Sequence, residues 1–292
     1  MMNIQGVYTA LVTPMRGGEV DYETLRKLVE FQIAGGVTGI VPVGTTGESP
    51  TLTYAEHAKV IEVAIEAAKK RCQIIAGTGA NCTREAIEMT KEAAKAGADG
   101  TLQVTPYYNK PTQEGLYRHF SEVADKGGLP VFLYNVPGRS GVGIAESTVA
   151  RLAANANVVA VKEAAGSVDR VSAILDLCGD DITVLSGDDS LTLPMMAVGA
   201  KGIISVSSNI IPAEMTRMVQ AFLQGDLAAA LALHRKYYGL FRDQFVETNP
   251  IPIKAAMAMK GLIAEEYRLP LCELAPASRE KLAKTLKRCG IL

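Results

Sequence analysis

The chain alternates short apolar runs with longer segments in which apolar residues recur at helical spacing. A short apolar run predicts a strand buried on both faces, as in a parallel sheet, and the longer segments predict the connecting helices. Such repeated βα units are typical of an α/β protein. Eight strands are predicted, at residues 7–13, 39–43, 73–77, 100–104, 131–135, 158–162, 183–186 and 202–206.

This number of strands matches a (β/α)8 TIM barrel. Two of the intervening helices carry N-terminal capping signals, namely Thr53 with Glu56, and Ser167 just before Asp169. The predicted helices cover residues 22–34, 53–70, 83–96, 113–126, 145–154, 169–177, 191–198 and 212–223.

The strand pattern disappears beyond Gly225, where three further helices are predicted at residues 226–247, 252–260 and 278–288. A barrel typically needs about 250 residues, so a chain of 292 residues can hold one together with an extension. We therefore expect a barrel domain at residues 1–224 and a C-terminal helical domain at residues 225–292.

Composition favours a globular protein that acts on a small molecule. Hydrophobic residues make up 48% of the chain and charged residues 21%, which supplies a large core. The 30 basic and 31 acidic residues form no long run of one sign, so neither a nucleic acid nor a membrane surface is the expected partner.

Cysteine and histidine placement predicts a cytoplasmic protein without a metal or other cofactor. The five cysteines are scattered and odd in number, as expected of free thiols in a reducing compartment. The N-terminus lacks a basic segment followed by an apolar core, so no secretory signal is predicted. The three histidines lie far apart and lack clustered ligand partners, which argues against a metal site.

One predicted strand, at residues 158–162, ends in a lysine that packing does not explain. A buried amine loses its hydration, so it either finds a charged partner or gives up its proton. A neutral amine in a pocket can attack a ketone and form a Schiff base. In the alternative interpretation, Lys162 extends its charge to solvent or pairs with Glu163, and this stretch alone favours neither.

Other polar residues follow neighbouring strands at the barrel end where active sites form. The segment 44–49, Gly-Thr-Thr-Gly-Glu-Ser, offers backbone N–H groups and hydroxyls to a carboxylate, although it also fits an ordinary turn. Tyr107 and Tyr108 stand in a proline-bounded loop, where a phenol could relay a proton or the loop could simply be stiff and exposed.

The strand at residues 131–135 contributes two more candidates. Tyr134 is predicted to face Lys162 as a general acid and base, or else to pack the upper barrel layer. Arg139 offers a planar fork to a substrate carboxylate, or lies in a surface loop. A lysine, a tyrosine and hydroxyls at one barrel end together suggest imine chemistry, in which an enamine attacks an aldehyde.

These motifs, over essentially the whole length, resemble the bacterial 4-hydroxy-tetrahydrodipicolinate synthase family of the N-acetylneuraminate lyase superfamily. The resemblance rests on residues 44–48, 105–109, 134–139 and 161–163. It implies that pyruvate forms a Schiff base with Lys162 and condenses with aspartate 4-semialdehyde, in the first step committed to diaminopimelate and lysine.

The same resemblance assigns roles to individual residues. Tyr134, Thr45 and Tyr108 would form a proton relay, with Tyr108 supplied by a neighbouring subunit, and the assembly would be a homotetramer built from two dimers. Substrate contacts would come from Thr46 at the pyruvate carboxylate, Arg139 at the semialdehyde carboxylate, and Gly187 and Ile204 in the pocket.

Two alternatives remain open on the sequence. N-acetylneuraminate lyases and 2-keto-3-deoxy sugar-acid aldolases share the lysine and the tyrosine, whereas Thr45 and Arg139 favour the synthase. A catalytically silent barrel could instead bind a keto acid as a sensor, although it would have no reason to retain the relay residues.

The resemblance also implies a regulator, since many members of the family are inhibited by lysine at a cleft between two subunits. Pro50 and Tyr54 depart from the pattern, since a well-studied sensitive type carries alanine and histidine there. L-Lysine is therefore a candidate effector, and the matching positions are Ser49, His57, Asn81, Glu85 and Tyr107.

Overall fold

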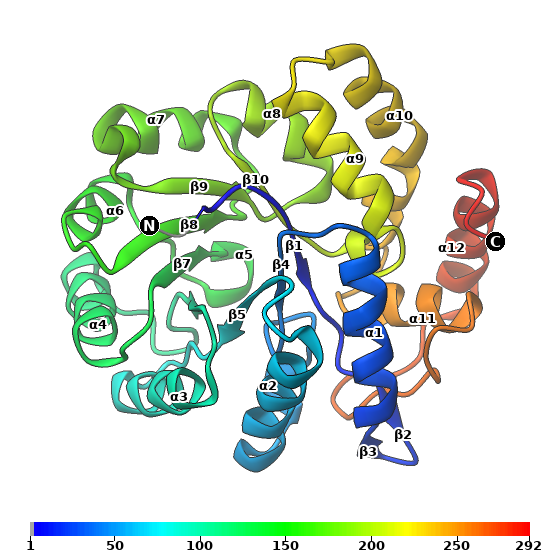
Figure 1. Cartoon of the computed structure of the whole chain (residues 1–292), viewed down its shortest axis with the longest axis horizontal. Helices are drawn as coiled ribbons and strands as arrows, with labels where there is room; N and C mark the ends of the chain where they lie inside the picture. Colours follow the sequence, from blue (N-terminus) through cyan, green and yellow to red (C-terminus); the bar gives the residue numbers. More distant parts are fainter. Residues whose placement is uncertain (1–2) are drawn as a thin grey trace.

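The computed structural model describes residues 3–292 and contains a closed barrel of parallel strands surrounded by helices (Figure 1). The strands follow the order β1-β10-β9-β8-β7-β6-β5-β4 and close between β4 and β1. Their bounds are β1 Gly6–Ala10, β4 Gly39–Val41, β5 Gln73–Gly77, β6 Gly100–Val104, β7 Val131–Asn135, β8 Val158–Glu163, β9 Thr183–Ser186 and β10 Gly202–Ser205.

Helices connect successive strands and form the outer layer of the barrel (Figure 1). They are α1 Tyr22–Ala34, α2 Tyr54–Ala68, α3 Thr83–Ala96, α4 Gln113–Lys126, α5 Pro137–Ser140, α6 Glu146–Ala153, α7 Val168–Cys178, α8 Thr192–Ala197 and α9 Pro212–Leu223. Short 3-10 turns lie at Ser49–Thr51, Gly179–Asp181, Asp189–Leu191 and Ser207–Asn209.

The predicted (β/α)8 barrel is confirmed, with all eight strands where the apolar runs place them. The first strand ends earlier than expected because Val12 N donates to Asn209 Oδ1 and Thr13 Oγ1 donates to Gly47 O, outside the strand ladder. The second also ends early, at Val41, and Val43 then takes a left-handed backbone with φ 50°.

Helix bounds agree closely with the pattern, and the capping signals explain their starts. Thr53 and Glu56 form a capping box before α2, so Thr53 itself lies outside the helix. Ser167 Oγ accepts from Arg170 N at the start of α7. Lys69 and Lys70 have positive φ and end α2 before the predicted boundary at residue 70.

The sequence pattern missed only short elements. These are the hairpin of β2 Met15–Arg16 with β3 Glu19–Val20, the single-turn helix α5 and the 3-10 turns. An element of two to four residues is shorter than the window in which a period can be recognised.

Side chains from alternate strand positions fill the barrel interior. Tyr8 and Phe132 are fully buried there, edge to face, with ring centroids 6.2 Å apart. Burying each such side chain contributes roughly 1.5–3 kcal/mol. The interior is therefore packed, and a ligand has to bind at one end of the barrel. The interior cluster also includes Ala10, Val41, Ile75, Leu102, Tyr134, Ala160, Leu185 and Ile204.

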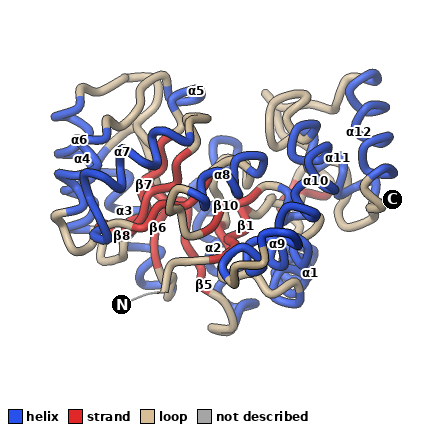
Figure 2. The backbone as a smooth tube through the Cα atoms, turned by 90° about the horizontal axis from the view of Figure 1, so that it is seen from above, coloured by secondary structure: helices blue, strands red, loops and turns tan. Residues whose placement is uncertain are grey.

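After α9, the chain forms α10 Leu227–Asp243, α11 Ile251–Met259 and α12 Pro276–Arg288. Figure 2 shows these three helices together on one side of the barrel, with α9 and α1 nearby. They confirm the three predicted C-terminal helices, whereas the division into two domains at residues 224 and 225 stays a prediction. Of the helices described here, none is both long and apolar enough to cross a membrane.

The C-terminal helices are joined to the barrel by buried polar contacts. Asp189, three residues after the end of β9, accepts from Ser205 Oγ at 2.5 Å, from Val206 N at 3.1 Å and from Gln244 Nε2 at 2.9 Å. Complete burial raises the pKa of this carboxyl. The contacts connect the segment after β9, the end of β10 and the end of α10, so the extension packs against the carboxyl ends of these strands.

Candidate active site

Lys162 lies near the carboxyl end of β8 and points into the barrel. It pairs in register with Tyr134 of β7, and its side chain is buried, with 5% exposed. Its Nζ atom is 4.1 Å from the centroid of the Tyr134 ring. Among residues 3–292, no carboxylate lies within 4.0 Å of this amine. The amine therefore meets an aromatic ring rather than a counter-charge.

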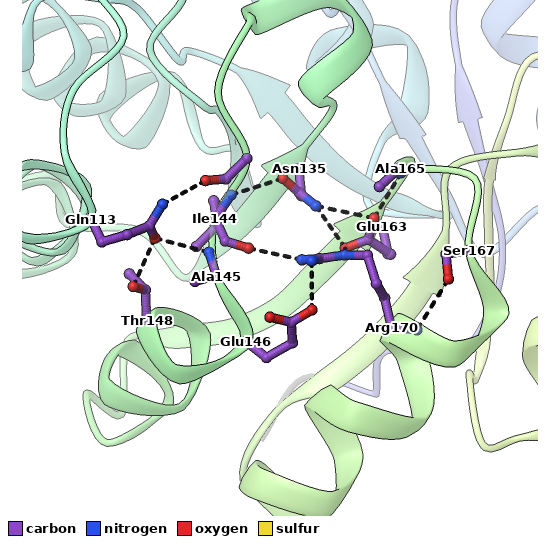
Figure 3. A network of polar contacts seen from close by, with 11 residues as sticks. Gln113, Asn135, Ile144, Ala145, Glu146, Thr148, Glu163, Ala165, Ser167 and Arg170 are labelled. Atoms are coloured by element: carbon purple, nitrogen blue, oxygen red, sulfur yellow. Dashed lines mark hydrogen bonds and ion pairs between the residues drawn. The ribbon is translucent and has the colours of Figure 1, made fainter.

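Glu163, the next residue on β8, points the opposite way because successive strand residues alternate between faces. Its fully buried carboxylate accepts from Asn135 Nδ2 at 3.0 and 2.8 Å, from Ala165 N at 2.7 Å and from Arg170 Nε at 3.4 Å (Figure 3). The alternative interpretation, in which Lys162 pairs with Glu163, is wrong, since each has different neighbours on opposite sides of the sheet.

The Glu163 network continues into the loop that carries Arg139. Asn135 Oδ1 accepts from Ile144 N at 3.0 Å, and Gln113 donates to Gly143 O and accepts from Ala145 N, each at 2.8 Å (Figure 3). One set of hydrogen bonds therefore fixes the ends of β7 and β8 and the far side of this loop.

Thr45 and Thr46 follow β4 in a tightly held loop. A Cβ atom on Gly47 would lie 2.9 Å from Val43 Cα, so the close turn needs glycine there. Thr45 is half-buried, whereas Thr46 is 3% exposed and its Oγ1 accepts from Asn249 Nδ2 at 3.0 Å. The two hydroxyls thus lie on one loop, and that of Thr46 is bound to Asn249.

Gly187 and Ile204 lie close to Lys162 or to its interior neighbours. A Cβ atom on Gly187 would lie 3.1 Å from Lys162 Cε and 2.7 Å from Ala164 Cβ. Ile204 is fully buried in the same interior cluster as Tyr134. Gly187 therefore leaves the space in which the lysine side chain extends.

A cavity of about 240 Å3 opens beside these residues at the carboxyl ends of the strands. Tyr134, Thr45 and Arg139 all line it, together with backbone of Gly77 and Gly79. The Arg139 side chain is exposed apart from one bond, from Nη2 to Asn249 O at 3.1 Å. Most of its guanidinium can still bind a carboxylate. Lys162 does not line the cavity itself, and its amine contacts the ring of Tyr134, which does.

Tyr108 does not join this group within one chain. Its side chain is 91% exposed, and its backbone is left-handed with φ 73°. Tyr107, its neighbour, lines the cavity and is 41% exposed. The loop therefore presents one tyrosine to its own cavity and the other outward.

The candidate effector residues fall into three places. Ser49 and Tyr107 line the main cavity, and Asn81 Nδ2 donates to Tyr107 O at 3.2 Å. Glu85 lies in a surface groove on α3 beside Tyr54. Slight burial of the Tyr54 phenol and the charge of the Glu85 carboxylate both raise the pKa of Tyr54. His57 is buried, with 6% exposed, and burial lowers its pKa.

Sequence reasoning missed Asn249 and Lys254, and it quoted Glu48 in the segment 44–49 without assigning it a role. Glu48 and Lys254 are fully buried and form an ion pair between the β4 loop and α11. The sequence does carry a sign of the buried cation, because Lys254 is the one charged residue in the apolar stretch Ile-Pro-Ile-Lys-Ala-Ala-Met. Residues 3–292 contain no group of three His, Cys, Asp or Glu side chains arranged to bind a metal ion.

The model of the Dihydrodipicolinate synthetase family matches residues 3–289. The chain belongs to this family. A curated relative, the 4-hydroxy-tetrahydrodipicolinate synthase of Thermodesulfovibrio yellowstonii, is 53% identical over 288 residues, which cover 99% of each chain.

Solved structures of related proteins have the same fold over the whole chain. The chloride-inhibited dihydrodipicolinate synthase of Acinetobacter baumannii, complexed with pyruvate, is 48% identical with a TM-score of 0.97, covering 99% of this chain and 100% of that one. The synthase of Cyanidioschyzon merolae with lysine bound is 42% identical with a TM-score of 0.95, covering 99% of both chains.

The space beside Gly187 gives a prediction for this site. In Gly187→Ala, the added methyl group displaces the Lys162 side chain, so synthase turnover should fall roughly 10- to 100-fold, as expected of a misplacement near 1 Å. Steady-state kinetics measures this loss. Gly138→Ala is the matched control, because a Cβ atom there meets nothing within 4 Å. Equal rates for both variants and the unmodified protein would contradict the assignment of Lys162, beside Gly187, as the reacting amine.

Proposed function

We propose that this chain condenses pyruvate with L-aspartate 4-semialdehyde to give 4-hydroxy-tetrahydrodipicolinate through a Schiff base on Lys162. The observation that carries the proposal is a buried amine that has no carboxylate partner among residues 3–292 and that contacts the ring of Tyr134, a residue lining the cavity. Family membership and the relatives named as this synthase support it.

The chemistry begins with attack of the neutral Lys162 amine on the ketone carbon of pyruvate. Water leaves and an imine forms, which withdraws electrons from the neighbouring methyl carbon. Loss of a proton from that carbon gives an enamine, which forms a carbon–carbon bond with the aldehyde carbon of the semialdehyde, and the aldehyde oxygen takes up a proton to become the hydroxyl group. The semialdehyde amino group then attacks the imine carbon, which closes the ring and releases the Lys162 amine. Tyr134 and Thr45, which line the cavity, carry protons to and from the reacting atoms.

Substrate carboxylates are bound at two places in this proposal. The Thr46 hydroxyl and the β4 loop bind the pyruvate carboxylate, near Ile204 and Gly187. Arg139 binds the semialdehyde carboxylate from the cavity wall, where a planar guanidinium can form two parallel hydrogen bonds. No step needs a cofactor, and we propose that the reaction takes place in the cytoplasm.

The neighbouring activities of the superfamily have less support. N-acetylneuraminate lyase and keto-deoxy sugar-acid aldolase would use the same lysine and tyrosine. The relatives reported above are named for the synthase instead, and Thr45 and Arg139 fit that choice.

Borohydride reduction tests the proposal directly. Reduction in the presence of pyruvate should inactivate the protein and add the mass of the reduced adduct to Lys162, because borohydride converts an imine into a stable amine. Intact-mass and peptide mass spectrometry locate the adduct. Borohydride without pyruvate is the control. An unmodified Lys162 after complete treatment would sink the mechanism.

We also propose that the active protein is a homotetramer built from two dimers, in which Tyr108 enters the site of a neighbouring copy. The exposure of its side chain leaves it available for this role.

Tyr108→Phe tests this relay. Loss of its hydroxyl should lower turnover by about 10- to 100-fold, because positioned proton transfer typically contributes about that much or more, while imine trapping by borohydride continues. Tyr238→Phe, on the exposed face of α10, is a matched control expected to keep full turnover. Unchanged turnover in Tyr108→Phe would argue against the relay.

L-Lysine inhibition is the remaining part of the proposal. Ser49, Asn81, Glu85 and Tyr107 can hold the charged groups of lysine, and a relative from Cyanidioschyzon merolae binds lysine in its crystal structure.

Millimolar lysine should lower the synthase rate, and Glu85→Gln should weaken this inhibition at least several-fold by removing a partner of the lysine ammonium. Glu92→Gln, which changes a second carboxylate of the same groove, is the control. The experiment is a titration of lysine in the steady-state assay. A rate that does not respond to lysine in the unmodified protein would rule the effector site out.

A further inference from the structure

Asn249 joins two loops of the site from the C-terminal segment. It lies between α10 and α11 and is 4% exposed. Its side-chain Nδ2 donates to Thr46 Oγ1 at 3.0 Å, and its main-chain oxygen accepts from Arg139 Nη2 at 3.1 Å. Both proposed carboxylate-binding residues, from the loops after β4 and β7, therefore contact this one residue.

The Asn249 side chain also decides how the Thr46 hydroxyl can be used. A hydroxyl has one proton to donate and two lone pairs that accept. Because the amide N–H occupies a lone pair of Thr46 Oγ1, the hydroxyl proton stays available. Among the described residues, Thr46 Oγ1 has no other hydrogen-bond partner. The proton can therefore be donated to an anionic ligand.

A second contact holds Asn249 in place. Lys254, one turn into α11, pairs with Glu48, two residues after Thr46, and both side chains are fully buried. Burial lowers the pKa of Lys254, and the Glu48 carboxylate opposes this effect. The segments 46–48 and 249–254 are thus joined by a neutral hydrogen bond and a buried ion pair.

We propose that Asn249 is a positioning residue for keto-acid binding, which orients the Thr46 hydroxyl as a donor and anchors Arg139. This inference rests on the proposed function, because the ligand carboxylate it serves is that of pyruvate. Lys254 and Glu48 maintain the placement of Asn249 and do not contact the ligand.

A pair of substitutions separates hydroxyl orientation from simple packing. In Asn249→Asp, the new carboxylate accepts the Thr46 proton, turns its lone pairs toward the ligand and adds a negative charge nearby. The half-saturating pyruvate concentration for borohydride trapping should rise roughly 10- to 100-fold at pH 8. Asn249→Ala leaves the proton free, so its rise should be only about threefold.

Two further measurements exclude a purely structural explanation. Lowering the pH protonates the buried carboxyl of Asn249→Asp. The half-saturating pyruvate concentration of this variant, divided by that of the unmodified protein, should therefore fall toward the ratio found for Asn249→Ala. In a Thr46→Val background, no hydroxyl remains to orient and only the added charge still separates the two Asn249 variants, so the difference between their half-saturating concentrations should be several-fold smaller than in the Thr46 background.

Asn209→Asp is the matched control for a buried amide. Asn209 is fully buried and bonds only to main-chain groups of Ala10, Val12 and Val206. This variant should lower Tm while leaving the pyruvate concentration dependence close to that of the unmodified protein.

The possible outcomes separate the two proposals. If the unmodified protein traps no pyruvate, the proposed function fails. If it traps pyruvate but Asn249→Asp and Asn249→Ala have the same concentration dependence as the unmodified protein, the inference about Asn249 is wrong. A difference between the two variants that is as large in the Thr46→Val background as in the Thr46 background overturns it as well.

Discussion

The alternation of side chains along β8 is the constraint on which the site depends. It sends Lys162 into the barrel and Glu163 to the other side, where Asn135, Ala165 and Arg170 all donate to the buried carboxylate. A shift by one residue would exchange the two side chains and leave a buried charge without partners, at a cost of several kcal/mol. The Glu163 contacts therefore fix the register that points the lysine toward Tyr134.

The C-terminal segment is the second requirement, because it supplies contacts that the barrel lacks. Desolvation offsets much of the attraction in a buried ion pair such as Lys254 and Glu48, so its net contribution to stability is small. Removing one partner, however, leaves the other charge buried and costs about 3–5 kcal/mol. The pair therefore acts mainly to specify one arrangement of α11 against the β4 loop. This arrangement places Asn249 beside Thr46 and Arg139.

Local sequence patterns were sufficient for the barrel and for the residues carried on strand ends. Lys162 and Tyr134 lie near the carboxyl ends of predicted strands and Thr45 follows one, so the (β/α)8 topology alone gathers them at one end. Asn249 and its partner Thr46 are 203 positions apart, and no local period links them. Tyr108 could not be placed by topology either, since its side chain points away from its own barrel. Contacts across distant loops depend on packing that a linear pattern does not encode.

Lys254 shows why an unexpected lysine in an apolar run is an incomplete signal. Both Lys162 and Lys254 are buried in apolar stretches of the sequence, yet Lys254 contacts a carboxylate and Lys162 contacts an aromatic ring. A counter-charge favours the ammonium form, which cannot attack a carbonyl. Burial is common to both lysines. Only the group that each amine contacts distinguishes the structural cation, Lys254, from the candidate nucleophile, Lys162. The decisive feature lies on other strands and loops, Tyr134 in one case and Glu48 in the other.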